Sequence, residues 1–180
     1  ILKDSDDILT LLDDQIMKTQ SMRGSPYIKP FEARTKKWES RLQLMSQVME
    51  EWLLCQKTWI YLEPIFSSED IMRQMPIEGR RFGVVDAYWR KTVDAAQKNP
   101  NLLEFVAETD NLLKTFQESN KMLGLIGKGL NDYLETKRLA FPRFYFLSND
   151  ELLSILSQTK DARAVQPHLS KCFEQVYRLN

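Results

Sequence analysis

The chain has 180 residues, of which 43% are hydrophobic and 28% charged, and its 25 Lys and Arg residues balance its 25 Asp and Glu residues. This composition is normal for a folded protein and excludes the low hydrophobicity of disordered chains. A zero net charge gives no long-range attraction to phosphates, so we expect protein partners and neither a nucleic acid nor a membrane.

The two cysteines, Cys55 and Cys172, are too few for the disulfide framework of small secreted domains, which favours a reducing, intracellular setting. The N-terminal segment carries acids before its apolar residues and so differs from a secretory signal. No stretch reads as a membrane span. The chain begins with Ile1 rather than Met, and we expect it to be a piece of a longer polypeptide.

Apolar residues recur every three or four positions between most of the prolines, and this spacing predicts an all-α chain. A first helix is expected to begin near residues 4–7, where acids favour the positive end of the helix dipole. Gly24, Ser25 and Pro26 should end it.

The strongest helical pattern covers residues 31–63, which Pro64 should close. At about 1.5 Å per residue this helix is about 45 Å long, so we expect an elongated helical bundle or rod. Its seam predicts a structural core, with a partner-binding stripe as the alternative. The seam residues are Trp38, Leu42, Met45, Met49, Trp52 and Trp59.

Shorter helices should follow. Ser67 or Ser68 is expected to cap one, and Pro76 should begin the next. A long helical stretch at about 102–138, either unbroken or broken near Thr109, can lie antiparallel to the second helix. Its predicted core residues are Phe116, Leu123 and Leu130.

Residues 141–147 form a dense aromatic run, and we predict one short strand-like segment there, because aromatic residues favour strands and proline disfavours helix before it. Ser148 or Asn149 should cap a following helix, and a last helix should start near Pro167. The junction 139–148 would join sub-bodies 1–138 and 149–180. The candidate hinge or docking residues, which could instead be core, are Phe141, Pro142, Arg143, Phe144, Tyr145 and Phe146.

Two sequence segments suggest a functional site, one for phosphate and one for zinc, but neither has the residues that such a site needs. GLIGKG at 124–129 lacks the glycine spacing and the Ser or Thr after Lys128 that a phosphate-binding loop needs. His168 and Cys172 lie four residues apart, yet a structural zinc site needs about four ligands. We therefore expect no catalytic, cofactor-binding or metal-binding residue in this chain.

Six segments follow one another in a recognisable order. They are MRGSPYIKPFE at 22–32, YLEPIFSSEDI at 61–71, VDAYWR at 85–90, GLNDYLETKR at 129–138, FPRFYFLSNDELLSILSQTKD at 141–161 and VQPHLSKCFE at 165–174. With them the chain resembles the linker of a dynein heavy chain, closer to axonemal than to cytoplasmic forms and to inner-arm than to outer-arm forms. Ala162 and Arg163, where a proline commonly follows TKD, and Gly127, where glutamine is common, leave the isoform open.

The resemblance implies a mechanical role. The dynein linker is an elongated helical element that arches over a ring of AAA+ modules, bends when ATP primes the ring, and straightens to produce the power stroke. Residues 1–180 would then be part of one elongated linker domain whose partner is the AAA+ ring of the same heavy chain.

The same resemblance assigns the chemistry to the parent protein. This segment would not be an enzyme and would bind no cofactor, while ATP and Mg would act in the ring of a parent microtubule motor ATPase. The parent would bind microtubules and other dynein chains in the axoneme of a cilium or flagellum. A helical scaffold or interaction module with no motor role is the alternative.

Overall fold

A computed structural model describes residues 1–3, 5–157, 166–174 and 176. These residues form helices and no strand, which confirms the all-α prediction and the packing of long helices in a bundle. None of the helices in these ranges has the length and apolarity that crossing a bilayer requires. In chain order the elements are α1 (Ser5–Arg23), η1 (Lys29–Phe31), α2 (Glu32–Phe66), α3 (Glu69–Gln74), α4 (Pro76–Lys98), α5 (Leu102–Glu108), α6 (Leu112–Ala140), η2 (Pro142–Phe146), α7 (Asn149–Leu156) and α8 (Leu169–Cys172).

The contacts of the chain define two compact units. Unit 1 comprises residues 1–58 and 87–121, and unit 2 comprises residues 59–86 and 122–180. The helices α2, α4 and α6 each contribute residues to both units. The predicted sub-bodies 1–138 and 149–180 do not coincide with these two units. They stay a prediction.

Unit 1 has an aromatic core centred on Trp52. The ring centroids of Trp89, Phe105 and Phe116 lie 6.1, 5.9 and 5.0 Å from that of Trp52. These rings come from α2, α4, α5 and α6, so one residue joins four helices. Tilted and edge-on pairs at such distances add about 0.5–1.5 kcal/mol each to the stability that burial provides.

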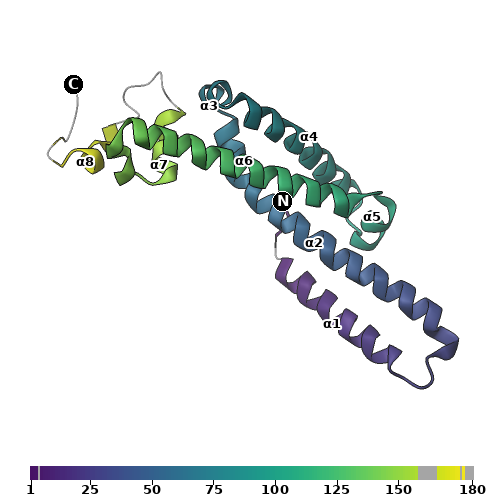
Figure 1. The fold of residues 1–180 in the computed structure, drawn as a ribbon. Helices are drawn as coiled ribbons and strands as arrows, with labels where there is room; N and C mark the ends of the chain where they lie inside the picture. The colour runs from purple at the N-terminus through teal and green to yellow at the C-terminus, as the bar shows by residue number, and fades with distance from the viewer. Residues whose placement is uncertain (4, 158–165, 175, 177–180) are drawn as a thin grey trace. The chain divides into compact units, whose positions relative to one another are not determined.

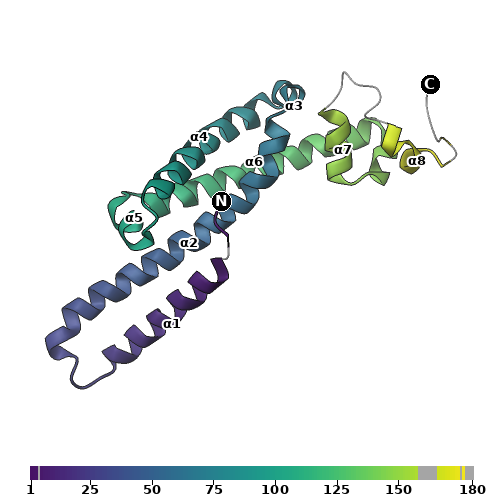
Figure 2. The same ribbon diagram turned by 180° about the vertical axis from the view of Figure 1, so that it is seen from behind.

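The helix α1 runs back along the first part of α2 in both ribbon views (Figures 1 and 2). An ion pair between Arg23 and the buried Glu39 fixes the far end of α1. At the other end Gln56, which interrupts the apolar seam of α2, binds the backbone of Leu2. The Leu2 N–H donates to Gln56 Oε1 (2.7 Å), and Gln56 Nε2 donates to the Leu2 carbonyl (2.9 Å).

Unit 2 has a separate apolar core. The rings of Phe66 on α2 and Phe82 on α4 stack with their centroids 5.3 Å apart. Leu134 on α6 and Leu152 on α7 are almost completely buried. The buried apolar side chains of unit 2 therefore come from α2, α4, α6 and α7.

The seam of α2 is buried over only part of its length. Met45 and Trp52 are buried, as are Phe116, Leu123 and Leu130 on α6. The core prediction for Trp38 is wrong, because this residue is 38% exposed.

Trp59, predicted as core, lies at the end of the seam in unit 2 and is half-buried. Its indole N–H donates to Asp86 Oδ1 at 2.9 Å. An indole N–H needs such a partner when it leaves water, so the position suits a side chain at the edge of a core.

Three helix boundaries differ from or refine the expectations. Pro64 does not close α2, since it lies inside the last turn, where a proline removes a single hydrogen bond. Ser68 precedes α3, but its hydroxyl donates to the Ser157 carbonyl (3.1 Å) instead of capping the helix. The optional break near Thr109 is present, and Asn111 there has a φ of 57°.

Candidate hinge and docking site

The aromatic run follows the end of α6 in unit 2 and is a 3₁₀ helix, so the prediction of a strand-like segment is wrong. Phe141 and Leu147, on either side of η2, have extended dihedrals. Between them the Phe144 N–H donates to the Phe141 carbonyl (2.9 Å) and the Leu147 N–H to the Phe144 carbonyl (3.1 Å). The segment satisfies its own backbone groups in this way and needs no partner strand.

Arg138, in the last turn of α6, ties this helix to the start of α7. Its Nη2 donates to the Leu147 carbonyl (3.2 Å) and to Asn149 Oδ1 (2.8 Å). The carbonyl bond reaches across η2 and ends two residues before α7. A rotation of α7 relative to α6 would have to break the bond to Asn149.

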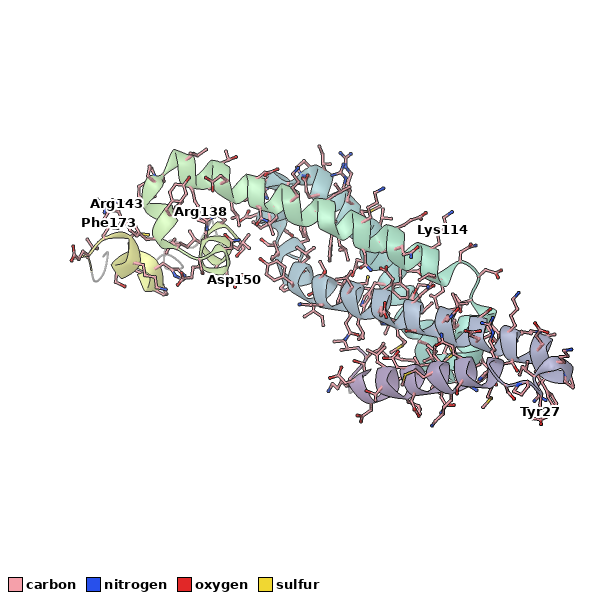
Figure 3. All side chains as sticks on the ribbon, turned by 60° about the horizontal axis from the view of Figure 1, so that its bottom comes forward. Tyr27, Lys114, Arg138, Arg143, Asp150 and Phe173 are labelled. Carbon is pink, nitrogen blue, oxygen red and sulfur yellow. The ribbon has the colours of Figure 1, made fainter. Side chains whose placement is uncertain are left out.

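Arg143 points from η2 toward the segment that ends α8, and Figure 3 shows it beside Phe173. Its Nη1 donates to the Cys172 carbonyl (2.8 Å), and its guanidinium carbon lies 4.7 Å from the centre of the Phe173 ring. The Phe141 ring lies 4.8 Å from that of Phe144 and 6.3 Å from that of Phe173. These four side chains hold η2 and the end of α8 together.

A second set of contacts joins α7 to α8 through Glu151. Its carboxylate accepts hydrogen bonds from Lys171 and from the Ser148 N–H (3.0 Å), and it lies 3.8 Å from His168 Nδ1. The Ser148 hydroxyl in turn accepts the Glu151 N–H, which completes a capping box and confirms Ser148 as the N-cap. The hydrogen bond from Lys171, followed by that from Ser148, lowers the pKa of Glu151 to about 2.

Three large side chains of the junction face solvent. Exposed fractions are 69% for Leu139, 68% for Phe146 and 51% for Tyr145. The Tyr145 hydroxyl donates to Glu135, and this bond raises the pKa of the phenol above its usual value. None of the six predicted residues is buried: Phe144 is half-buried, and the other five are exposed, although Phe141 and Arg143 also contact the Phe173 ring.

The two segments that resembled a phosphate-binding loop and a metal site have other roles in the structure. Residues 124–129 lie inside α6, so their N–H groups belong to the helix and form no phosphate-binding loop. Cys172 is buried, which raises the pKa of its thiol, and its Sγ lies 3.7 Å from the Arg143 carbonyl oxygen. Within the described ranges no group of three or more His, Cys, Asp or Glu side chains could hold a metal ion.

Sequence reasoning missed two residues of this site. Arg138 gave no signal, because an arginine in a last helical turn is common for dipole reasons alone. Glu151 did give one, because Ser148 and Glu151 have the spacing of a capping box before an apolar run. Ala162 and Arg163 lie outside the described residues.

Comparisons with known proteins cover the whole chain. A family model described as "Dynein heavy chain, N-terminal region 2" matches residues 1–180. "Dynein axonemal heavy chain 1" of Rattus norvegicus is 57% identical over 99% of the chain, and "Dynein axonemal heavy chain 3" of Homo sapiens is 58% identical over 97%. "Dynein axonemal heavy chain 12" of Homo sapiens is 56% identical over 99%. The chain spans 4%, 4% and 6% of these three relatives.

Proposed function

Since the chain belongs to the dynein heavy chain family and matches its N-terminal region 2, we propose that it is a non-catalytic mechanical segment, part of the linker of an axonemal motor. The linker changes conformation over the AAA+ ring of the same heavy chain and drives the power stroke along microtubules in cilia and flagella. The full-length family match carries this proposal.

The chemistry belongs to the rest of the heavy chain in this proposal. ATP and Mg act in the ring, and the parent binds microtubules and other dynein chains in the axoneme. Long helices and a helical 124–129 segment support a mechanical role for the part described by the structure. We expect the purified 180-residue chain to turn over no ATP, and turnover above that of a control preparation would contradict this.

Within the linker we propose that residues 139–149 act as a hinge between the sub-bodies 1–138 and 149–180. Hinges often lie at the ends of helices, where a few residues absorb the change in backbone angles. The two Arg138 hydrogen bonds would then be a latch that opens and closes, and the exposed Leu139, Tyr145 and Phe146 would dock on the ring.

The test uses the complete heavy chain that contains this segment. Arg138→Ala should lower the velocity of microtubule gliding while ATP turnover by the ring continues, because the latch acts on movement and not on chemistry. Lys114→Ala, on the exposed face of α6, is the matched control. Structures of the parent in two nucleotide states should show residues 139–149 changing their backbone angles.

The alternative of a scaffold with no motor role makes opposite predictions. A scaffold segment would leave gliding velocity unchanged in Arg138→Ala. It would also have the same conformation in both nucleotide states. A bend located elsewhere in the segment would retain the linker role and reject only the hinge at residues 139–149.

A further inference from the structure

Unit 1 contains a groove of about 940 Å³ that the proposed function does not use. It lies between the second half of α1, the connecting residues 24–31, and the first turns of α2. Its volume is in the range of sites that bury much of a ligand. Figure 3 shows Tyr27 on the connecting segment at this end of α1 and α2.

The apolar lining of the groove is unusually open to solvent. Exposed fractions are 84% for Tyr27, 59% for Phe31, 58% for Met22 and 38% for Trp38. Large apolar side chains gathered in one concave place indicate a binding surface, whereas single ones are normal. Tyr, Trp and Met are also the residue types that interface cores favour.

The wall formed by α2 is cationic. Arg34, Lys37, Trp38 and Arg41 have the spacing i, i+3, i+4 and i+7, so they share one face of the helix with the tryptophan among three positive charges. All three cations are exposed, and none makes an ion pair with a residue that the structure describes.

No acidic side chain lines the groove. Of the acids next to the lining, Glu39 is buried and bound to Arg23, and Asp14 pairs with Lys18. Glu32 is exposed in the first turn of α2, so one carboxylate stands near three groove cations. The balanced charge of the whole chain therefore hides a local excess of positive charge around an apolar cleft.

We propose that this groove binds an acidic peptide segment of another protein, with apolar side chains spaced between its carboxylates. The apolar side chains would enter between Met22 and Trp38, and the carboxylates would pair with Arg34, Lys37 and Arg41. Charge complementarity carries this choice of partner, because a cationic rim around an apolar cleft selects acidic, amphipathic ligands.

A lipid surface and a second copy of the chain fit less well. A membrane contacts apolar groups that protrude, whereas Met22 and Trp38 line a groove. A second copy would bring its own acidic segment 6–14 to the groove, and this would appear as self-association. Both are outcomes of the test.

The test selects ligands for the 180-residue chain from a display library of random peptides. Enriched peptides should be rich in Asp and Glu and should carry apolar residues between them. Their affinity should fall at least about tenfold for Tyr27→Ala and for the triple variant Arg34→Glu, Lys37→Glu, Arg41→Glu. Added salt should weaken binding to the wild-type chain.

A matched triple variant controls for net charge. Lys57→Glu, Lys91→Glu and Lys121→Glu change three exposed lysines of unit 1 outside the groove and should leave peptide binding unchanged. Tyr27 and the three groove cations are all exposed, so their variants should unfold at the same urea concentration as the wild type.

Four outcomes overturn the proposal. They are the absence of any enriched peptide, enriched peptides without acidic residues, equal loss of binding in the two triple variants, and acidic peptides that bind the groove variants as well as they bind the wild type. Binding of phosphatidylserine vesicles in place of peptides would assign the groove to a membrane. Sedimentation of the chain as a dimer that the groove variants abolish would assign it to a second copy.

Discussion

Gly127 and Gly129 are two residues apart in α6 and differ in what a side chain would meet. A Cβ at Gly129 would lie 2.9 Å from Cγ of Glu78, whereas one at Gly127 would meet nothing within 4 Å. Replacing a glycine inside a helix by alanine stabilises the folded chain by about 0.5–1 kcal/mol, because alanine loses less backbone freedom on folding. We expect Gly127→Ala to raise the free energy of unfolding by this amount in urea titrations.

Gly129→Ala should raise the free energy of unfolding less, or lower it, because the Glu78 side chain would have to move away from α6. Glu78 is a flexible side chain near Arg81 (3.9 Å), so the structure can adjust without unfolding. Equal gains at the two glycines would show that the approach of Glu78 to Gly129 has no energetic consequence.

Single positions also show what periodicity can and cannot predict. The spacing of four and three placed Met45 and Trp52 in the core, since it reports which face of a helix is apolar. It could not report that Trp38 stays 38% exposed in a groove between α1 and α2, because burial depends on how another helix packs. In the sequence Gln56 appeared only as a break in the apolar seam of α2. Its role in hydrogen bonding the Leu2 backbone depends on where Leu2 lies in the fold.

At the scale of elements, the contact between α7 and α8 should depend on pH through Glu151. The folded pKa of this carboxyl is lowered to about 2 from an ordinary value of 4.5. A lowered pKa means that the ionised form is favoured in the folded chain, so its contribution is complete above about 4.5 and disappears as the pH falls toward 2.

The measurement is hydrogen exchange of the α8 amides between pH 6 and pH 3. After correction for the intrinsic effect of pH, protection should fall in the wild type and change much less in Glu151→Gln, which lacks the titrating group. Glu118→Gln, on the exposed face of α6, should behave like the wild type. Identical pH profiles for Glu151→Gln and the wild type would contradict the role of Glu151.

Arg143 should control how firmly the end of α8 is held against η2. Arg143→Ala removes the hydrogen bond to the Cys172 carbonyl and the contact with the Phe173 ring. We expect the buried Cys172 thiol to react on the order of tenfold faster with a disulfide reagent, since these contacts together provide about 1–3 kcal/mol.

Two comparisons make this experiment specific. Arg143→Lys keeps the positive charge but loses the planar group that covers the ring, so its rate should fall between those of the wild type and Arg143→Ala. Cys55 is completely buried in unit 1 and should react equally slowly in all three proteins. An unchanged Cys172 rate would show that α8 is held by other contacts.

The aromatic run shows where prediction of an element fails. The proline and the aromatic residues of 141–147 correctly predicted the end of a long helix, and Phe141 and Leu147 are indeed extended. A strand, however, needs a partner for its backbone groups, and the sequence offers no second candidate strand. Proline is equally suited to the first turn of a helix, and Pro142 begins η2 in this way.

At the scale of the molecule, the periodic spacing of apolar residues predicted the helices but not the two units. The reason is that α2, α4 and α6 each continue through residues of both units without a glycine or proline at the boundary. Residues 58–59, 86–87 and 121–122, where the units divide, lie inside helices. Sequence signals for domain boundaries are loop signals, and they are absent at these three positions.

Helical continuity also predicts that the two units unfold together. Helix formation is cooperative along the chain, so unwinding α2, α4 and α6 in one unit removes support from their remaining turns in the other. Leu134→Ala in unit 2 creates a cavity at a side chain that is 1% exposed and should cost about 2–5 kcal/mol.

The two cysteines report the outcome, because Cys55 lies in unit 1 and Cys172 in unit 2. In urea, Leu134→Ala should lower the midpoint of thiol exposure for Cys55 together with that for Cys172. Leu139→Ala, on the same helix but 69% exposed, should leave both midpoints in place. A fall in the Cys172 midpoint alone would mean that each unit unfolds independently, and that strain in one unit is not passed to the other through these three helices.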